Sequence, residues 1–95
     1  MQIVQTETFK VWLAELTDRQ AVARIVVRIR RLELGNAGDT KSVGDGVSEM
    51  RIDYGSGYRV YFTRRGKSIV ILLCGGDKKT QRKDIVAAQK MAKEA

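Results

Sequence analysis

The chain lacks histidine and proline, and it has a single cysteine, Cys74, among its 95 residues. Without histidine, catalytic triads that depend on an imidazole base are excluded. One cysteine and no histidine also leave too few of the usual ligands for a zinc site, so we expect neither a metal nor another cofactor. A lone thiol in an apolar run forms no internal disulfide and fits a reducing compartment, which predicts a cytoplasmic protein.

Long hydrophobic runs are missing as well. No segment approaches the ~18 apolar residues that a membrane-spanning helix requires, and the N-terminus has no apolar segment of a signal peptide. We therefore expect no contact with a membrane. Ninety-five residues, 43% of them hydrophobic, suit a single domain over residues 1–95 with one modest core.

Charge is abundant and mainly positive. Lys and Arg total 18 against 11 Asp and Glu, which gives a net charge of +7. A positive field concentrates anions, so the composition favours RNA, DNA or an acidic protein as the partner. The alternative is a basic soluble protein without such a partner.

The first half of the chain predicts a short strand followed by two helices. Residues 1–5 alternate weakly, as a strand does. Apolar residues at helical spacing then define a first helix, and the spacing from Thr17 to Gln20 is that of a capping box, which starts a second helix. Gly35 suits the left-handed position after its end. The apolar residues of the two helices are Phe9, Trp12, Leu13 and Leu16 in the first, and Val22, Ile25, Val26, Ile29 and Leu32 in the second.

Residues 36–46 are polar and rich in glycine, which predicts a loop. Two alternating segments follow and meet at residues 55–57, which suit a three-residue hairpin loop. If Tyr54 pairs with Tyr58, Met50 lies opposite Phe62 on one apolar face, where Ile52 also meets Val60. On the other face, the same register sets Asp53 opposite Arg59 and Arg51 opposite Tyr61.

A third segment, residues 68–74, is apolar at nearly every position, which predicts a strand in the interior of the sheet. A terminal helix over about residues 80–93 turns Ile85, Ala88, Met91 and Ala92 inward. The order strand, helix, helix, strand, strand, strand, helix predicts an α+β fold. In it, the helical hairpin and the C-terminal helix pack with a small, mainly antiparallel sheet.

The sheet face opposite the helical hairpin is expected to stay open, at least centrally. It carries Arg51, Arg59 and Tyr61, and Lys78 and Lys79 arrive from the loop after the third apolar strand. Arginines on a rigid sheet can hold phosphates through paired hydrogen bonds. A ribonuclease must stabilise charge on phosphorus, and fixed cations can do so, while proton transfer would fall to Lys, Tyr, Asp or Glu. The alternative is a purely structural ion pair between Asp53 and Arg59.

Two further sequence patterns give weaker indications of a binding site. Arg24, Arg28 and Arg31 share one face of the second helix, where they could bind RNA or simply be solvated. The glycine-rich residues 75–80 precede a helix but lack the spacing of a nucleotide-binding loop.

The hairpin segment, residues 44–62, resembles the central hairpin of the RelE/ParE toxin superfamily. Together with residues 73–81, Asp84-Ile85 and residues 30–36, it looks like the phage Gp49-like, HigB-related branch of addiction-module killer proteins. The resemblance implies a RelE-like fold and the toxin of a type II toxin–antitoxin pair, with a cognate antitoxin of helix-turn-helix type. It further implies a ribosome-dependent endonuclease that cleaves mRNA; alternatives are a non-enzymatic poison of DNA gyrase and a non-toxic RNA-binding module.

The resemblance also implies roles for particular residues. The catalytic arginine of the Gly-Tyr-Arg motif falls on Arg59, and a basic residue of the preceding strand falls on Arg51, which would grip the neighbouring phosphate. Lys78 or Lys79 would stabilise the phosphorane together with Arg59. RelE-type enzymes have a second basic residue where this chain has Glu49.

The proton-transfer residues of RelE-type enzymes match this sequence less closely than the basic residues do. RelE-type enzymes use a C-terminal aromatic residue or histidine, whereas near that position this chain offers Asp84. HigB-like relatives have an acidic residue in that area. Asp84 and Tyr61 are therefore the acid–base candidates.

Overall fold

The computed structural model describes residues 1–95 and is built around a five-stranded sheet in the order β1-β5-β4-β3-β2. Three α-helices and a short 3₁₀ turn complete an α+β fold, which confirms the predicted class. The elements are β1 (Gln2–Gln5), α1 (Glu7–Glu15), α2 (Arg19–Glu33), β2 (Thr40–Gly44), β3 (Val47–Arg51), β4 (Arg59–Arg65), β5 (Ile69–Gly76), η1 (Lys78–Thr80) and α3 (Gln81–Glu94). None of the helices is long and apolar enough to cross a membrane.

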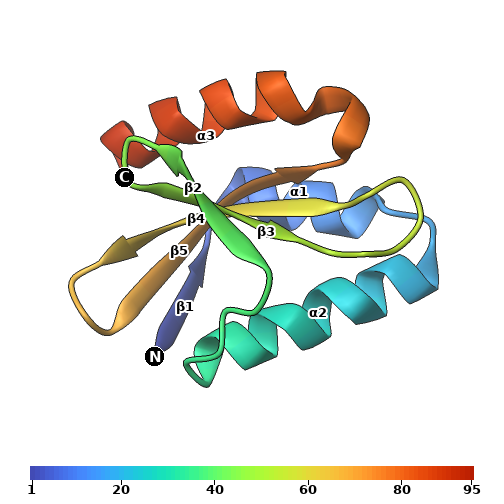
Figure 1. The fold of residues 1–95 in the computed structure, drawn as a ribbon, viewed down its shortest axis with the longest axis horizontal. Coiled ribbons are helices and arrows are strands. Elements are labelled where there is room, and N and C mark those ends of the chain that lie inside the picture. The colour runs from blue at the N-terminus through green and yellow to red at the C-terminus, as the bar shows by residue number, and fades with distance from the viewer.

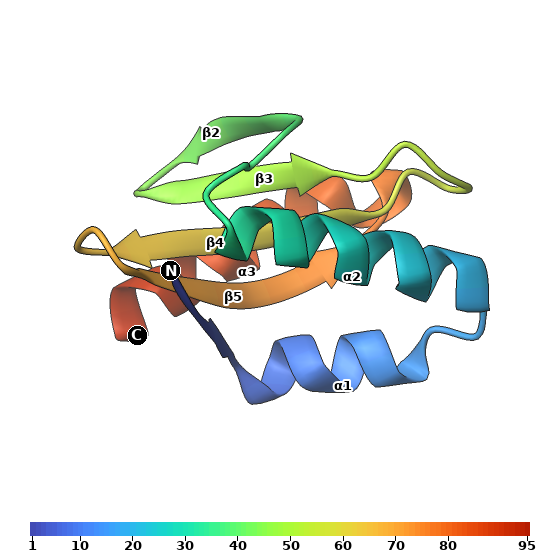
Figure 2. The same ribbon diagram turned by 90° about the horizontal axis from the view of Figure 1, so that it is seen from below.

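The sheet is mainly antiparallel, as predicted, and only β1 runs parallel to its neighbour, β5. Helices lie on both sides of it (Figures 1 and 2). On one side, Phe9 of α1 and Ile25 and Leu32 of α2 join the buried side chains of β3, β4 and β5. On the other side, Ala88 and Ala92 of α3 pack in a second cluster with residues of the same strands.

The expectation of an open sheet face is therefore wrong. Tyr61 has no exposed surface and Arg59 retains only 8%. The physical reason lies in α3, whose apolar stripe needs a surface to bury itself against. Val47, Leu73 and the ring of Tyr61 supply that surface.

The start and end of α2 depart little from the prediction. Asp18, rather than Thr17, is the N-cap: its Oδ1 accepts hydrogen bonds from the backbone N–H groups of Gln20 (3.0 Å) and Ala21 (3.2 Å). A carboxylate here also benefits from the positive end of the helix dipole. Gly35 adopts a φ of 92° after the last turn, as predicted.

The buried stripe of α2 is narrower than its apolar residues suggested. Ala21, Ile25 and Leu32 are fully buried, whereas Val26 is 47% exposed. The residues that face the sheet follow the i, i+4, i+11 positions, and Val26 lies off that line.

The prediction of a loop over residues 36–46 is wrong in its second half, because β2 pairs with β3 there. Thr40 lies opposite Met50 and Ser42 opposite Ser48. Asp45 and Gly46 form the turn, with φ angles of 55° and 75°. Positive φ at both central residues is the requirement of the two-residue hairpin turn that Asp-Gly favours.

The register predicted between β3 and β4 is also wrong, by two residues. Met50 lies opposite Val60 and Arg51 opposite Arg59, and residues 52–58 form a longer connection. A shift of two keeps every side chain on its predicted face, so Met50 and Val60 still share the core side. The shift changes only which residues meet across the strands.

The long connection is anchored to the start of α2. The hydroxyl of Tyr54 donates to the Asp18 carboxylate, with Oη–Oδ2 at 3.0 Å, and the Arg24 guanidinium lies 4.7 Å from the centre of the Tyr54 ring. Within the connection, the N–H of Ile52 still donates to the carbonyl oxygen of Tyr58 at 2.9 Å. The contacts of Tyr54 therefore hold the tip of the connection against α2.

Candidate active site

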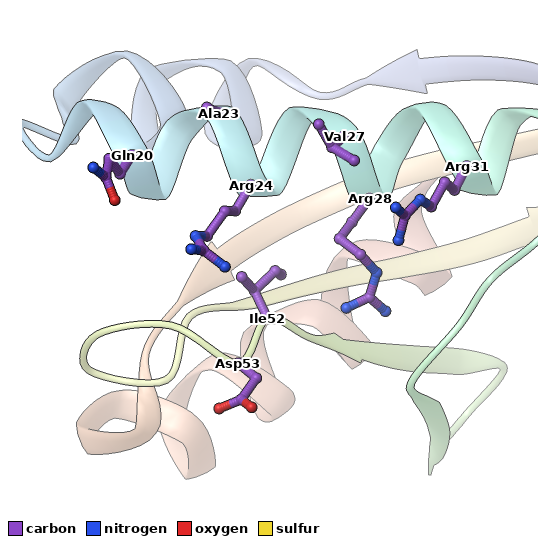
Figure 3. A pocket seen from close by; sticks show the side chains of 8 residues that line it. All are labelled: Gln20, Ala23, Arg24, Val27, Arg28, Arg31, Ile52 and Asp53. Carbon is purple, nitrogen blue, oxygen red and sulfur yellow. The ribbon is translucent and has the colours of Figure 1, made fainter.

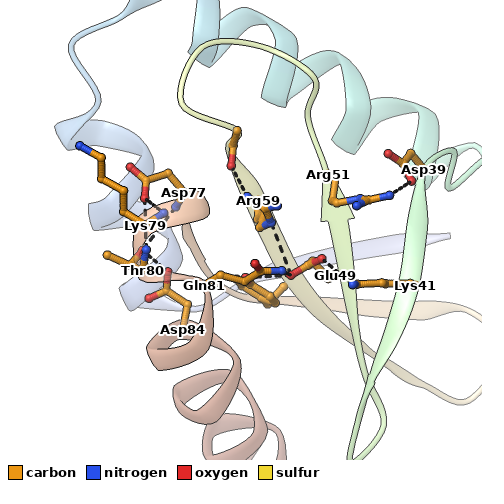
Figure 4. Close-up of polar contacts among 12 residues, drawn as sticks. Asp39, Lys41, Glu49, Arg51, Arg59, Asp77, Lys79, Thr80, Gln81 and Asp84 are labelled. Atoms are coloured by element: carbon orange, nitrogen blue, oxygen red, sulfur yellow. Dashed lines mark hydrogen bonds and ion pairs between the residues drawn. The ribbon is translucent and has the colours of Figure 1, made fainter.

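Arg59, the first residue of β4, lies at the centre of a strip of polar side chains across the sheet (Figure 4). Its Nη1 donates to the carbonyl oxygen of Gly57 at 2.7 Å, and its Nε lies 3.6 Å from Oε2 of Glu49. Nη2 has no acceptor within the protein and is not among the buried unpaired atoms. One nitrogen of a nearly buried guanidinium therefore remains available to a ligand.

Arg59 forms no ion pair with Asp53, so the structural alternative raised by the sequence is wrong as stated. The carboxylate beside Arg59 is that of Glu49 on β3. Glu49 is completely buried, and its Oε2 also accepts from the Tyr61 hydroxyl at 3.1 Å and from the Gln81 amide at 2.9 Å. Arg59 is thus tied to a buried polar network rather than to a surface pair.

A hollow of about 250 Å³ opens beside Arg59, and we call it the arginine cleft. Its lining residues are Asp39, Arg51, Ile52, Asp53, Gly57, Tyr58 and Arg59. The corrected register places Arg51 directly opposite Arg59. Like charges across a strand pair repel, and an anion between them would relieve that repulsion.

Arg51 is more exposed than Arg59: its side chain retains 46% of its accessible surface, against 10% for Arg59. Its Nη2 lies 3.3 Å from Oδ1 of Asp39, whose side chain is 56% exposed. An exposed pair of this kind contributes little to stability and can be exchanged for another anion at small cost. Arg51 can therefore move from Asp39 to a phosphate.

Lys78 and Lys79 lie on η1, the turn between β5 and α3. The Asp77 carboxylate accepts from the backbone N–H of Lys79 at 2.9 Å and so fixes the turn. The backbone N–H of Lys78 donates to the carbonyl of Ser56 at 3.3 Å, which brings η1 against the tip of the β3–β4 connection. Both lysine side chains are exposed beside the strands that carry the arginines.

Asp84 lies in the first turn of α3, over the end of β5. Its Oδ2 accepts from the Thr80 hydroxyl at 2.5 Å. A Cβ atom at Gly76 would overlap this carboxylate, so the absence of a side chain at Gly76 is what allows Asp84 to approach the strand. Gly76 is the partner of Arg59 across β4 and β5, which puts Asp84 near the arginine site but outside the lining of the arginine cleft.

Tyr61 does not reach the cleft. Burial, followed by the charge of Glu49 and the hydrogen bond to it, raises the pKa of the Tyr61 phenol far above its usual range. The hydroxyl therefore stays protonated and acts as a donor to Glu49. Of the two acid–base candidates, only Asp84 retains an exposed part.

The predicted arginine face of α2 lines a second hollow, of about 520 Å³, which we call the α2 hollow (Figure 3). Arg28 is engaged by the fold: its guanidinium donates to the backbone carbonyls of Arg51 (2.5 Å), Ala37 (3.2 Å) and Asp39 (3.4 Å). Arg24 stacks on Tyr54, while Arg31 is exposed. The lining residues are Gln20, Ala23, Arg24, Val27, Arg28, Arg31, Ile52 and Asp53.

The two hollows share Ile52 and Asp53 and so adjoin one another. Arg24 and Arg31 thus line the hollow that adjoins the arginine cleft. Sequence reasoning did not find Glu49, Gln81 or Asp39 as members of the site. No group of three or more acidic, cysteine or histidine side chains is placed to hold a metal ion.

The family model described as "Phage derived protein Gp49-like (DUF891)" matches residues 11–93 of this chain. That range contains both hollows, η1 and nearly all of α3. An "Uncharacterized protein" of Haemophilus influenzae (strain ATCC 51907 / DSM 11121 / KW20 / Rd) is 54% identical over 94 residues, which cover 99% of this chain and 95% of that protein. The chain therefore belongs to the Gp49-like family of phage-derived proteins, a family related to toxin–antitoxin systems.

Proposed function

We propose that this chain is the toxin of a toxin–antitoxin pair and that it stops translation by cleaving mRNA on the ribosome. The observation that carries the proposal is the arginine cleft, where Arg51 and Arg59 lie opposite each other and line one small hollow. Two guanidinium groups so arranged suit the phosphates of an RNA backbone.

The cleavage would begin when a ribose 2′-hydroxyl loses its proton and its oxygen attacks the adjacent phosphorus. The bond from phosphorus to the 5′-oxygen of the next nucleotide then breaks, which leaves a 2′,3′-cyclic phosphate and a 5′-oxygen that takes up a proton as a 5′-hydroxyl. Arg59, whose Nη2 has no acceptor within the protein, stabilises the charge that develops on phosphorus, and preorganised donors of this kind typically supply a large part of the rate. Arg51 leaves Asp39 and holds the neighbouring phosphate. Lys78 and Lys79 add positive charge from η1.

Proton transfer is assigned to Asp84 in this proposal, because Tyr61 is buried. Asp84 is half-buried, and its Oδ2 is held by the Thr80 hydroxyl. The chain has no histidine, and Asp84 and the two lysines of η1 are titratable groups beside Gly76, the strand partner of Arg59, that keep some exposed surface. Asp84 would take this role in a complex in which the RNA strand extends from the arginine cleft to the start of α3.

Two observations favour an mRNA substrate that is bound on the ribosome. The arginine cleft is small, so it engages little of an RNA strand by itself, and the substrate must be held and oriented by something else. The resemblance to the RelE/ParE superfamily supports the ribosome in that role. The same resemblance supports a cognate antitoxin of helix-turn-helix type, which would keep the basic surface covered until it is degraded.

The test is induction of the chain without its antitoxin, followed by mapping of mRNA 5′ ends. We expect growth arrest and new 5′ ends within coding regions, which disappear when translation is blocked beforehand. Arg59→Lys should reduce cleavage by about 10²–10³-fold and leave a slow residual rate, because a point charge does not reproduce the planar fork of a guanidinium. Arg64→Lys, on the same strand but with an exposed side chain, is the matched control and should cleave normally.

Other outcomes would point elsewhere. Growth arrest without new 5′ ends, together with inhibition of purified gyrase, would replace the endonuclease by a non-enzymatic poison. Normal growth with confirmed folded protein would contradict both toxin hypotheses and leave an RNA-binding module.

A further inference from the structure

Glu49 is the most buried charged residue in the chain, and the proposed cleavage does not use it directly. Its Oε1 has no hydrogen-bond partner, which is unusual for a carboxylate without exposed surface. We propose that Glu49 is a positioning residue that orients Arg59 toward the scissile phosphate. This inference rests on the proposed function and specifies how that site is held in place.

One oxygen atom of Glu49 joins two parts of the site. Oε2 lies 3.6 Å from Nε of Arg59 and accepts from the Gln81 amide at 2.9 Å. Arg59 begins β4, whereas Gln81 begins α3 directly after η1, the turn with Lys78 and Lys79. Figure 4 shows Glu49 on one side of Arg59 and the η1 turn on the other. Glu49 therefore couples the position of Arg59 to that of the lysine turn.

The effect of Glu49 on Arg59 depends on charge rather than shape. The Nε–Oε2 distance of 3.6 Å satisfies an ion pair, but Nε has no hydrogen-bond acceptor. The other fixed nitrogen, Nη1, is held by the Gly57 carbonyl at 2.7 Å, which leaves Nη2 for the cleft. A glutamine at position 49 could keep the bonds to Tyr61 and Gln81 but would lose the attraction on Nε.

The cleavage test compares Glu49→Gln with the wild type in single-turnover cleavage of mRNA on programmed ribosomes. We expect Glu49→Gln to slow cleavage by about 10²-fold, the effect expected of a displacement near 1 Å at a reacting group. In an Arg59→Lys background, Glu49→Gln should cause no further loss, because Glu49 acts only through the guanidinium. Lys41→Gln is the matched control: Lys41 lies 4.0 Å from the other oxygen of Glu49, is 55% exposed, and should not affect the rate.

A second measurement reports on Arg59 without any cleavage. In wild-type protein from cell-free synthesis, the buried Nε–H of Arg59 should give an NMR signal protected from exchange with water, assigned by its loss in Arg59→Lys. Glu49→Gln should broaden or lose that signal, while Lys41→Gln keeps it. An unchanged signal in Glu49→Gln would overturn the inference, and so would full cleavage by Glu49→Gln or equal losses in both backgrounds. If the wild type does not cleave RNA, the proposed function fails, and the NMR signal alone decides whether Glu49 orients Arg59.

Discussion

Arg59→Ala should destabilise the fold strongly, apart from any effect on activity. The substitution leaves the Glu49 carboxylate, with no exposed surface, without the cation 3.6 Å away. Removal of one partner of a buried pair typically costs about 3–5 kcal/mol of unfolding free energy. We take the lower end, about 3 kcal/mol, because Lys41 lies 4.0 Å from the other oxygen of Glu49 and offsets part of the charge. For a chain of this length, that corresponds to a fall in Tm of roughly 12–24 °C.

The same reasoning predicts a rescue. Glu49→Gln removes the charge that Arg59 neutralises, so the double variant Arg59→Ala with Glu49→Gln should regain a large part of the lost stability. Urea unfolding of wild type, both single variants and the double variant measures this directly. We expect the two substitutions to be coupled by at least about 1 kcal/mol, which lies within the range of about 0.5–3 kcal/mol for residues in contact within one network.

The reasoning would be refuted by either of two results. One is a loss in Arg59→Ala of no more than the ~0.5 kcal/mol typical of surface substitutions. The other is additivity, with the double variant as unstable as the sum of the two single variants. The double variant should remain inactive in RNA cleavage even when its stability is restored, which separates the folding role of Arg59 from its proposed catalytic role.

Three other predictions concern the surroundings of Arg59. Lys78→Ala combined with Lys79→Ala should lower RNA cleavage while the free energy of unfolding in urea stays within about 0.5 kcal/mol of wild type, since both side chains are exposed; a large loss of stability would show that they are structural. Gly76→Ala should lower the free energy of unfolding by about 1–3 kcal/mol, because the new Cβ overlaps the Asp84 carboxylate. Asp84→Ala in the same chain should recover part of that loss. A Gly76→Ala variant as stable as the wild type would contradict this packing. Burial, with the charge of Asp84, raises the pKa of the Cys74 thiol to about 12 from about 9. The unfolded chain therefore loses this proton at a lower pH than the folded chain does. The contribution of the thiol to the free energy of unfolding is fully present below pH 9 and should decline toward pH 12. The decline should be smaller in Cys74→Ala, and an identical decline would mean that the thiol is not protected by folding.

The sequence by itself determined the α+β class, the two N-terminal helices and the face on which each strand residue lies. These features depend on the spacing of apolar residues along short segments, which neighbours elsewhere in the chain do not alter. The resemblance to the toxin superfamily directed attention to Arg59 and Arg51, and the structure brings both to one cleft. Asp45-Gly46 is a further local signal, because this pair favours a two-residue hairpin turn and so indicates a strand before β3.

Only the tertiary structure decided which residues meet around Arg59. A register shift of two residues leaves the alternation of β3 and β4 unchanged, so the pattern alone could not distinguish Tyr61 from Arg59 as the partner of Arg51. In the folded chain, the β3–β4 connection is also held by a distant contact, the hydrogen bond from Tyr54 to Asp18 at the start of α2. The packing of α3 on the second sheet face likewise converted a seemingly solvated strand face into a buried network. Burial and partnership depend on surfaces that come together only in the folded chain, and for that reason the positioning of Arg59 could not be predicted from the sequence.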